Sequence, residues 1–465
     1  MKRHQTMRGA RIPLIIPVEN QVRELEPKIL LACIAARRGF PVVIGSRLEV
    51  DYHIASFTRS IYLSKSMTER SVKMFRIMRK LGHEIAAWDE EALVHPPAET
   101  YFTRRLSRSA IGEVSHLFAW GEENAELWRA YPHYPQTPIH ITGNPRGDML
   151  RPELRTYYDD VVQRRRDAYK DFVLVNTNFG FVNAFNPSQN LFIPGSKPER
   201  VGRAAVGMRP EFATGMRDHK QLLFDHFRRL IPILERAFPD INIVIRPHPV
   251  ERPDIYRDIA ARSRRVHVTN EGNIIPWLMA ARAIIHNGCT SGVESYVLGV
   301  PAIAYRPTVN EYYDDTVFRL PNRLSHQCFE FDELCDTLGK ILEGSLGAAN
   351  GAQRSQLLRP FLCSRTGPLA SERIVDTLDQ RVGFSGPNAG SRFDGWQHAT
   401  RRRLVKKLKG LLPGSKYHPA FQRYRYPGLT LEEMRGRVEQ FQALLGDGDP
   451  VRVERLRDHI FRLAV

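Results

Sequence analysis

Short apolar runs punctuate the sequence, and each ends in a polar, charged or glycine-bearing loop that leads into a helical pattern. This alternation predicts β-strands and helices arranged as parallel α/β layers. In such folds, binding and catalytic groups gather in the loops at the strand ends. The predicted strands with their loops are 12–18, 41–45, 60–64, 84–88, 114–121 and 138–143 in a first series, and 172–180, 241–249, 265–270, 283–286 and 301–307 in a second.

The two series predict two α/β domains, one at 1–150 and one at 151–380, in a chain of 465 residues. Glycine and proline followed by charged residues at 143–153 are typical of a connection between domains. Residues 181–215 are rich in Asn, Pro, Gly and Ser and predict a long functional loop. The remainder, 381–465, is predicted to be a linker followed by a basic helical tail.

The linker is expected at the Gly/Ser-rich stretch 383–400, and the tail that follows is strongly basic. Between 392 and 425, ten residues are Arg or Lys and one is acidic. The leucine spacing of 401–412 fits either an interfacial helix on a membrane or a helix packed across the first domain. The last helix is predicted to begin after Thr430, because Glu433 stands three residues later in a capping-box pattern.

The chain has 68 Lys and Arg residues against 51 Asp and Glu residues, a formal net charge of +17. Such a charge points to an anionic partner: a nucleotide, an acidic glycan, a nucleic acid or a membrane surface. The five cysteines contain no C-x-x-C pair and the sixteen histidines no H-E-x-x-H pattern, so we predict reduced thiols and no metal. No apolar run has the length of a membrane span or of a signal-peptide core. We therefore expect a cytoplasmic protein that attaches to the inner membrane, if at all, peripherally.

The strongest local signal is Arg246-Pro247-His248-Pro249, at the end of a β-rich run. The prolines stiffen the loop and remove two backbone donors. A guanidinium and an imidazole that project from a strand end can bind a phosphate, so Arg246, His248 and Pro249 are donor-site candidates. The competing interpretation is a rigid turn with a solvated arginine.

A second signal joins a strand to a helix at 286–301. Glycines there permit close backbone approach, and the free N–H groups and hydroxyls at the helix start suit a phosphate. Glu294 follows Ser291 by three residues, so it either accepts hydrogen bonds from a ribose or completes a capping box. The spacing matches neither a P-loop nor a G-x-G-x-x-G fingerprint. The donor-site candidates here are Asn287, Gly288, Thr290, Ser291, Gly292 and Glu294.

Amide side chains stand at two further positions where a nucleotide or sugar could bind. Asn176 and Asn178 follow the first strand of the second series. Asn144 and Arg146 lie at the predicted connection and are candidates for an acceptor or hinge site. We predict that both pairs line one cleft.

Charged clusters follow two strands of the first series. Three adjacent acids raise one another's pKa by repulsion, as a general base requires, although a solvated helix N-terminus explains them as well. A second cluster, where the first strand enters the first helix, fits either an acceptor-sugar site or a surface charge network. The first cluster is Asp89, Glu90 and Glu91, and the second is Glu19, Arg23, Glu24 and Glu26. We place Glu24 and His248 beside the three acids as candidates for acid/base work.

Taken together, these segments resemble the GT-B glycosyltransferases, and more narrowly the bacterial surface-carbohydrate biosynthesis proteins. The resemblance spans nearly the whole chain in order, which makes it more specific than any one motif. It implies two Rossmann-like α/β domains that face a cleft, an acceptor domain first and a donor domain second, with a C-terminal helical tail. The segments that carry it include YLSKSM, GHEIAAWDEEALV, ITGNPRGDMLRPEL, VLVNTNFG, RPHPVE, HNGCTSGVESYVLGVPAIAYRP and ASERIVDTL.

The Arg-Pro-His-Pro loop also resembles the His-Pro motif of sialyltransferases and Kdo-type transferases that use CMP-sugars. That resemblance implies that His248 and Pro249, with Thr290 and Ser291, hold the donor nucleotide. The acidic loop resembles the paired acids that supply a base in inverting members. Ala92 stands where that motif has glycine, which is a departure.

The resemblance implies a metal-independent glycosyltransferase that moves a sugar, Kdo or a related acidic one, from a nucleotide-sugar donor to a surface-glycan acceptor. The implied partners are that donor, a glycan or lipid-linked acceptor and, through the basic tail, an anionic membrane surface. Two other enzymes fit the same scaffold: a CDP-glycerol-type polyol-phosphate transferase and a nucleotide-sugar epimerase. Outside enzymes, the charge allows a nucleic-acid-binding protein, but no RRM, KH or helix-turn-helix signature is present, and no nucleic acid is expected.

Overall fold

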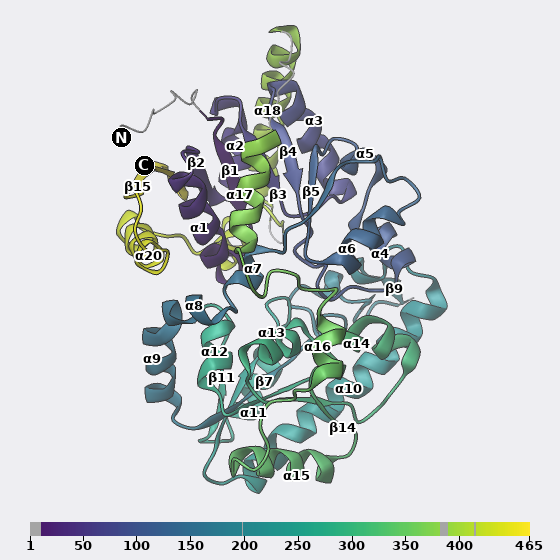
Figure 1. Ribbon diagram of the computed structural model, residues 1–465. Helices are drawn as coiled ribbons and strands as arrows, with labels where there is room; N and C mark the ends of the chain where they lie inside the picture. The colour runs from purple at the N-terminus through teal and green to yellow at the C-terminus, as the bar shows by residue number, and fades with distance from the viewer. Residues whose placement is uncertain (1–10, 198, 382–388, 413–414) are drawn as a thin grey trace. The chain divides into compact units, whose positions relative to one another are not determined.

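A computed structural model describes residues 11–197, 199–381, 389–412 and 415–465 of the chain. The chain divides into two compact units (Figure 1). The first unit is made of Met1–Glu90, Arg105–Met149 and Pro360–Val465, and the second of Glu91–Arg104 and Leu150–Arg359. The change at Met149 falls inside the connection expected at 143–153, but the tail, expected as a third region, belongs to the first unit.

The first unit contains an eight-stranded sheet with β1 near its centre. Its order is β15-β16-β2-β1-β3-β4-β5-β6, so the chain leaves β1 for β2 on one side and returns to β3 on the other. The carboxyl edge of the sheet at such a reversal is where α/β proteins bind ligands. The parallel strands are β1 (Leu14–Val18), β2 (Val42–Ser46), β3 (Ile61–Ser64), β4 (Glu84–Ala87), β5 (His116–Ala119) and β6 (Ile139–Ile141).

Helices from both ends of the chain cover this sheet. In α1, every residue from Glu24 to Ala36 is buried. Because α17 and α20 both pack on α1, residues 360–465 join the first unit rather than stand alone. The expected capping box of Thr430 and Glu433 is present at the start of α20. The helices are α1 (Gln21–Arg37), α3 (Val72–Leu81), α6 (Glu122–Arg129), α7 (Pro145–Asp148), α17 (Ala370–Arg381), α18 (Ala389–Gly410), α19 (Pro419–Arg425) and α20 (Leu431–Leu444).

The predicted linker at 383–400 is helical over its second half. Residues 383–388 lie outside the described residues, whereas α18 begins at Ala389. Gly395 and Ala399 in this helix are buried, and a Cβ on Gly395 would lie 3.1 Å from the backbone nitrogen of Leu81 on α3. Small residues thus mark close helix contact here rather than a flexible connection.

The tail also ends in a hairpin that the sequence analysis did not predict. Strands β15 (Arg452–Arg457) and β16 (Ile460–Ala464) pair antiparallel, and β16 pairs antiparallel with β2. Gly45 in β2 permits this approach, because a Cβ there would lie 2.1 Å from the carbonyl oxygen of His459. The arginines of both strands obscure the apolar alternation that predicts a strand.

The second unit contains a six-stranded parallel sheet in the order β11-β10-β7-β12-β13-β14. Here the order reverses at β7, which lies between β10 and β12. The register places Asn176, the last residue of β7, opposite Arg246 on one side and His286 on the other. The strands are β7 (Phe172–Asn176), β10 (Asn242–Arg246), β11 (Val266–Val268), β12 (Ala283–His286), β13 (Ala302–Tyr305) and β14 (His326–Cys328).

Helices flank this sheet, and the predicted loop at 181–215 has structure of its own. A short antiparallel pair, β8 (Phe192–Ile193) and β9 (Arg200–Val201), lies over a small apolar cluster that contains Leu191 and Met216. Helix α10 begins at Pro210, inside the range predicted as a loop. The helices that position the site are α10 (Pro210–Ala237), α12 (Ile275–Ala280), α13 (Thr290–Leu298) and α14 (Thr316–Arg323). None of the helices in the described parts of the chain is both long and apolar enough to cross a bilayer.

Candidate functional site

At the carboxyl edge of the second sheet, the loops after β7 and β12 are joined by side-chain amides. The Asn178 Nδ2 donates a hydrogen bond of 2.9 Å to the carbonyl oxygen of Gly288. The Asn287 Nδ2 donates one of 3.4 Å to the carbonyl oxygen of Asn178. The structure therefore brings together Asn176, Asn178, Asn287 and Gly288, which the sequence placed in one candidate donor site.

A buried carboxylate, Glu251, organises the loop after β10. Its Oε1 accepts hydrogen bonds from Thr177 Oγ1 (2.9 Å), the Phe179 nitrogen (3.0 Å) and the His248 nitrogen (3.1 Å). Its Oε2 accepts one from the Tyr256 hydroxyl (2.6 Å). Burial raises the pKa of Glu251, although these donors act in the opposite direction. Glu251 was not among the predicted site residues, and its one signal in the sequence is an acid two residues after the Arg-Pro-His-Pro motif.

His248 and Pro249 are half-buried on that loop. The Val250 nitrogen donates a hydrogen bond of 3.3 Å to His248 Nδ1. With Nδ1 as an acceptor, the neutral imidazole carries its proton on Nε2. Glu251 therefore sets the backbone of the motif, and Val250 sets the tautomer of its histidine.

Arg246 makes its hydrogen bonds to a neighbouring loop within the protein. The guanidinium donates to the carbonyl oxygens of Glu271, at 2.9 Å, and of Gly272, and it lies 5.6 Å from the ring centre of Trp277. Burial, with the nearby charge of Arg165, lowers the pKa of Arg246 to about 9. Arg246 thus stabilises the neighbouring loop at Glu271 and Gly272. This differs from the free guanidinium that was expected to bind a phosphate.

The helix start after β12 is tightly built. Gly288 has a φ of +81°, and a Cβ there would lie 2.6 Å from the Phe318 ring. Thr290, Ser291 and Gly292 form the first turn of α13, whose N-cap is Cys289. Because the N-cap precedes Ser291 by two residues, Ser291 and Glu294 do not form the alternative capping box. Glu294 is buried on the second turn.

His286, at the end of β12, is held neutral by its hydrogen bonds. The Gly288 nitrogen donates to His286 Nδ1 (3.1 Å), and His286 Nε2 donates to Ser325 Oγ (2.9 Å), which donates to the Pro321 carbonyl oxygen. Burial lowers the pKa of His286 to about 4. The neutral ring therefore holds the backbone of Gly288 in place.

We expect acid to weaken this arrangement. As the pH falls, the unfolded chain binds a proton near pH 6.5, whereas folded His286 resists it down to about 4, so stability present above pH 6.5 is lost between those values. Between pH 7 and pH 5 this amounts to about 2 kcal/mol. Urea unfolding should show a smaller loss for His286→Asn than for the wild type, while exposed His133→Asn should match the wild type. An equal loss in all three proteins would contradict the assignment.

Several polar atoms at this edge are buried without a partner in the described residues. They include both amide atoms of Asn176 and the Oδ1 of Asn287. Lys220, on α10, is 1% exposed, and its ammonium has no hydrogen-bond or ion-pair partner there. The Lys220 Nζ lies 4.1 Å from the ring centre of Phe318, the side chain that packs against Gly288. Burial lowers the pKa of Lys220 to about 8, with Asp314, Cys289 and Glu251 as the acids that oppose this shift.

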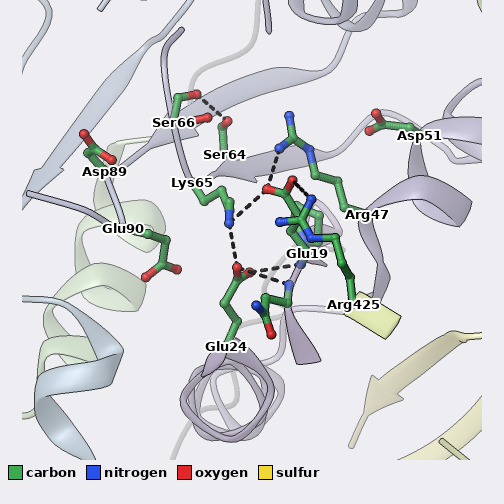
Figure 2. Close-up of polar contacts among 12 residues, drawn as sticks. Glu19, Glu24, Arg47, Asp51, Ser64, Lys65, Ser66, Asp89, Glu90 and Arg425 are labelled. Carbon is green, nitrogen blue, oxygen red and sulfur yellow. Dashed lines mark hydrogen bonds and ion pairs between the residues drawn. The ribbon is translucent and has the colours of Figure 1, made fainter. Parts of the chain in front are cut away.

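The first unit has its own charged cluster at the reversal of its sheet (Figure 2). Glu19 follows β1 and Lys65 follows β3; their side chains lie 2.9 Å apart. Arg47 Nη1 and Arg425 Nη1 also contact the Glu19 carboxylate, at 2.9 and 2.6 Å. Burial disfavours the Glu19 charge, but these three cations hold its pKa well below the usual value. The cluster thus joins β1, β3 and the C-terminal tail.

Glu24 forms the buried end of this cluster. Its carboxylate pairs with Lys65 (2.6 Å) and Lys28 (2.8 Å) and accepts from the backbone nitrogens of Glu19 and Asn20. Burial alone would raise its pKa, but Lys28 and Lys65 outweigh it and bring the pKa of Glu24 to about 2. An ionised carboxylate with both oxygens engaged is a poor proton acceptor, so this geometry favours a structural role for Glu24.

The three adjacent acids have different surroundings. Asp89 is bound through both oxygens by Arg105. Glu90 Oε1 accepts from the Trp88 indole at 3.0 Å and lies 3.7 Å from Lys28 Nζ, while Glu90 Oε2 is buried with no hydrogen-bond partner among the described residues. Glu91 is half-buried at the start of a segment of the second unit. Asp89 and Glu90 thus have different partners, and within the described residues only Glu90 of these two has an oxygen that accepts no hydrogen bond.

The remaining candidates are part of the framework of the first unit. Asn144 caps α7 by accepting from the Arg146 nitrogen at 3.0 Å. Arg146 lies 5.7 Å from the ring centre of Trp120 and donates to the Glu90 carbonyl oxygen at 3.3 Å. Arg23 lies half-buried on the first turns of α1. Within the described residues, no group of three or more His, Cys, Asp and Glu side chains is arranged to hold a metal ion.

No family model and no curated protein matches this chain. Among solved structures, it is similar to the wall teichoic acid polymerase TagF, in a variant soaked with CDPG: the TM-score is 0.51 at 11% identity, over 79% of this chain and 88% of that one. It is also similar to a UDP-GlcNAc 2-epimerase of Methanocaldococcus jannaschii in complex with UDP-GlcNAc and UDP, with a TM-score of 0.44 at 12% identity over 80% and 100% of the chains. The predicted α/β fold of the GT-B type is confirmed.

Proposed function

We propose that this protein is a transferase that builds a surface glycan from a nucleotide-activated sugar, with the donor bound at the carboxyl edge of the second sheet. The observation that carries the proposal is the unpaired ammonium of Lys220, which is 1% exposed. A buried charge without a counter-charge destabilises a fold unless a ligand supplies one. Its electrostatic neighbours Cys289 and Glu251 belong to the loops after β12 and β10, where the donor is expected.

A nucleotide phosphate suits this edge for three reasons. Lys220 supplies a positive charge, and the first turn of α13 supplies backbone N–H groups with the hydroxyls of Thr290 and Ser291. The amides of Asn176 and Asn287 have free hydrogen-bonding atoms for a sugar or ribose. A phosphate bound this way needs no divalent cation, so metal independence stays our prediction.

The reaction we propose is displacement at the anomeric carbon of the donor sugar. The bond from that carbon to the phosphate oxygen breaks, and the nucleotide leaves with the electron pair and its negative charge. Lys220 and the α13 amides stabilise this charge. The acceptor hydroxyl forms the new bond and loses its proton to a base. We propose Glu90 of the first unit for that role and the first unit as the part that binds the acceptor.

A CMP-linked acidic sugar such as Kdo is the donor we place first, because of the His-Pro motif at His248 and Pro249. Transfer of a polyol phosphate from a CDP-linked donor is the second candidate. It is supported by the fold likeness to TagF, which extends over 88% of that chain. The two differ in the bond that breaks, since polyol-phosphate transfer breaks the phosphate anhydride.

The deciding experiment is a thermal-shift screen with CMP, CDP, UDP, GDP and ADP, each with and without EDTA. A nucleotide at 100 times its Kd stabilises by about 2.7 kcal/mol. We expect a selective shift with CMP that EDTA does not change. A shift with CDP alone favours polyol-phosphate transfer, and one with UDP, GDP or ADP keeps a nucleotide-sugar enzyme and removes the CMP assignment. The proposal is wrong if no nucleotide shifts the melting temperature.

A further inference from the structure

Helix α18 has an apolar stripe that none of the described parts of the chain covers. Its other face packs on α3, where Gly395 and Ala399 are buried, and buried Lys406 on this helix pairs with Asp51 at 3.3 Å. On the open face, Leu404 is 58% and Leu408 65% exposed. At 3.6 residues per turn, Phe393, Leu404 and Leu408 lie within about 60° of one another around the helix axis. Leu411 and Leu412 extend the exposed stripe beyond the helix end, at 77% and 59% exposed.

Cations border this stripe on both sides. Exposed Arg401 and Lys407 lie about 60° to either side of Leu404 around the helix axis. Between residues 389 and 412 the chain has seven Arg and Lys residues and one acid, Asp394. That acid is paired with Lys80 and His398, so no acidic group of the helix opposes the cations along the stripe.

This pattern selects one kind of partner. A nucleic acid would pair with the cations but leave exposed leucines in water, which gains nothing. A bilayer with anionic headgroups accepts both, because leucines enter the headgroup–acyl boundary while flanking Lys and Arg side chains meet the lipid phosphates. The stripe runs along one side of a single helix. A planar bilayer surface can contact such a stripe along its whole length.

We propose that the open face of α18, with Leu411 and Leu412, binds the surface of an anionic lipid bilayer. This inference does not depend on the donor site, because it rests on residues of the C-terminal tail alone. The helix would lie in the interface plane with its α3-packed face toward the protein.

The chain contains a natural probe for this contact. Of its five tryptophans, Trp88, Trp120, Trp128 and Trp277 are at most 2% exposed, whereas Trp396 on α18 is 51% exposed. Quenchers outside the protein should therefore act mainly on Trp396. Vesicles with brominated acyl chains quench only a tryptophan that reaches the boundary of the acyl region.

The test uses the full chain and vesicles of phosphatidylethanolamine with phosphatidylglycerol, against vesicles of phosphatidylcholine. We expect at least tenfold tighter binding to the anionic vesicles, and quenching of Trp396 fluorescence by brominated lipid that Trp396→Phe removes. L404S/L408S should weaken binding at least tenfold, and R401Q/K407Q should weaken it and reduce its salt dependence. The control, Leu222→Ser, alters a leucine that is 44% exposed on α10 and should bind as the wild type does.

Circular dichroism and melting temperature should be unchanged in all variants, because every substituted position is exposed. The proposal is overturned if the wild type prefers no anionic vesicle, including the case in which the face serves a protein partner instead. It is also overturned if L404S/L408S binds like the wild type, which would show attraction by charge alone. Nucleotide shifts measured on the same variants report on the donor site separately.

Discussion

Replacing Lys220 with methionine is expected to make the ligand-free protein more stable and to remove most of its stabilisation by nucleotide. The two effects have opposite signs because the ammonium is costly in the empty site and useful in the occupied one. The fold lowers the pKa of Lys220 from 10.5 to about 8, which corresponds to about 3 kcal/mol against the charged form at neutral pH. Losing a hydrogen bond to a charged group weakens binding by about 10- to 100-fold.

The pH dependence of the wild type follows from the same shift. Between pH 8 and 10.5, the unfolded chain binds the lysine proton and the folded chain does not, so the free energy of unfolding contributed by Lys220 rises with pH. Nucleotide affinity should fall over this range, because the site loses its charge. K220M should show neither effect.

Urea unfolding and thermal shifts at pH 7 and pH 9.5 measure both quantities. Lys340→Met is the matched control, since Lys340 is an exposed lysine of the same unit paired with Asp336. It should leave nucleotide binding unchanged. A K220M protein that is less stable without ligand and keeps the full nucleotide shift would show that Lys220 is a packing residue.

The strand ends were predictable because their signals are local. A buried parallel strand is an apolar run, and the residues that follow it reach the carboxyl edge whatever the order of the strands. Asn176, Asn287 and His248 could therefore be assigned to one edge from the sequence. The glycine pattern likewise predicted the tight start of α13.

The residues that bury or pair with each charged side chain were not predictable, because they come from distant parts of the chain. Arg425 contacts Glu19 from 406 residues away, and no local pattern indicates it. Lys220 stands in a long amphipathic helix, where a lysine normally faces solvent, and only the tertiary structure, which packs Phe318 against it, shows that it is buried. The three adjacent acids look equivalent in sequence, but Arg105 and Trp88 separate the roles of Asp89 and Glu90.

Glu90 is therefore the residue at which a conservative change should cost the most activity. Glu90→Gln keeps the shape of the side chain and an oxygen for the Trp88 indole, but it removes the ability to accept a proton and the charge that lies 3.7 Å from Lys28 Nζ. General-base catalysis contributes about 10²- to 10⁴-fold, so kcat should fall by that factor while the nucleotide shift persists. Turnover is measured as nucleotide release from the activated sugar that the screen selects, with acceptor present.

Asp89→Asn provides the comparison within the same loop. It weakens a partly buried ion pair with Arg105, whose side chain is 26% exposed, so this variant should lose stability more than turnover per folded molecule. A base must also leave its mark on the pH profile: the acidic limb of kcat should be present in the wild type and in D89N and absent in E90Q. If E90Q retains the limb and most of the activity, another group accepts the proton of the acceptor hydroxyl. The buried oxygen of Glu90 would then be a structural feature of the first unit.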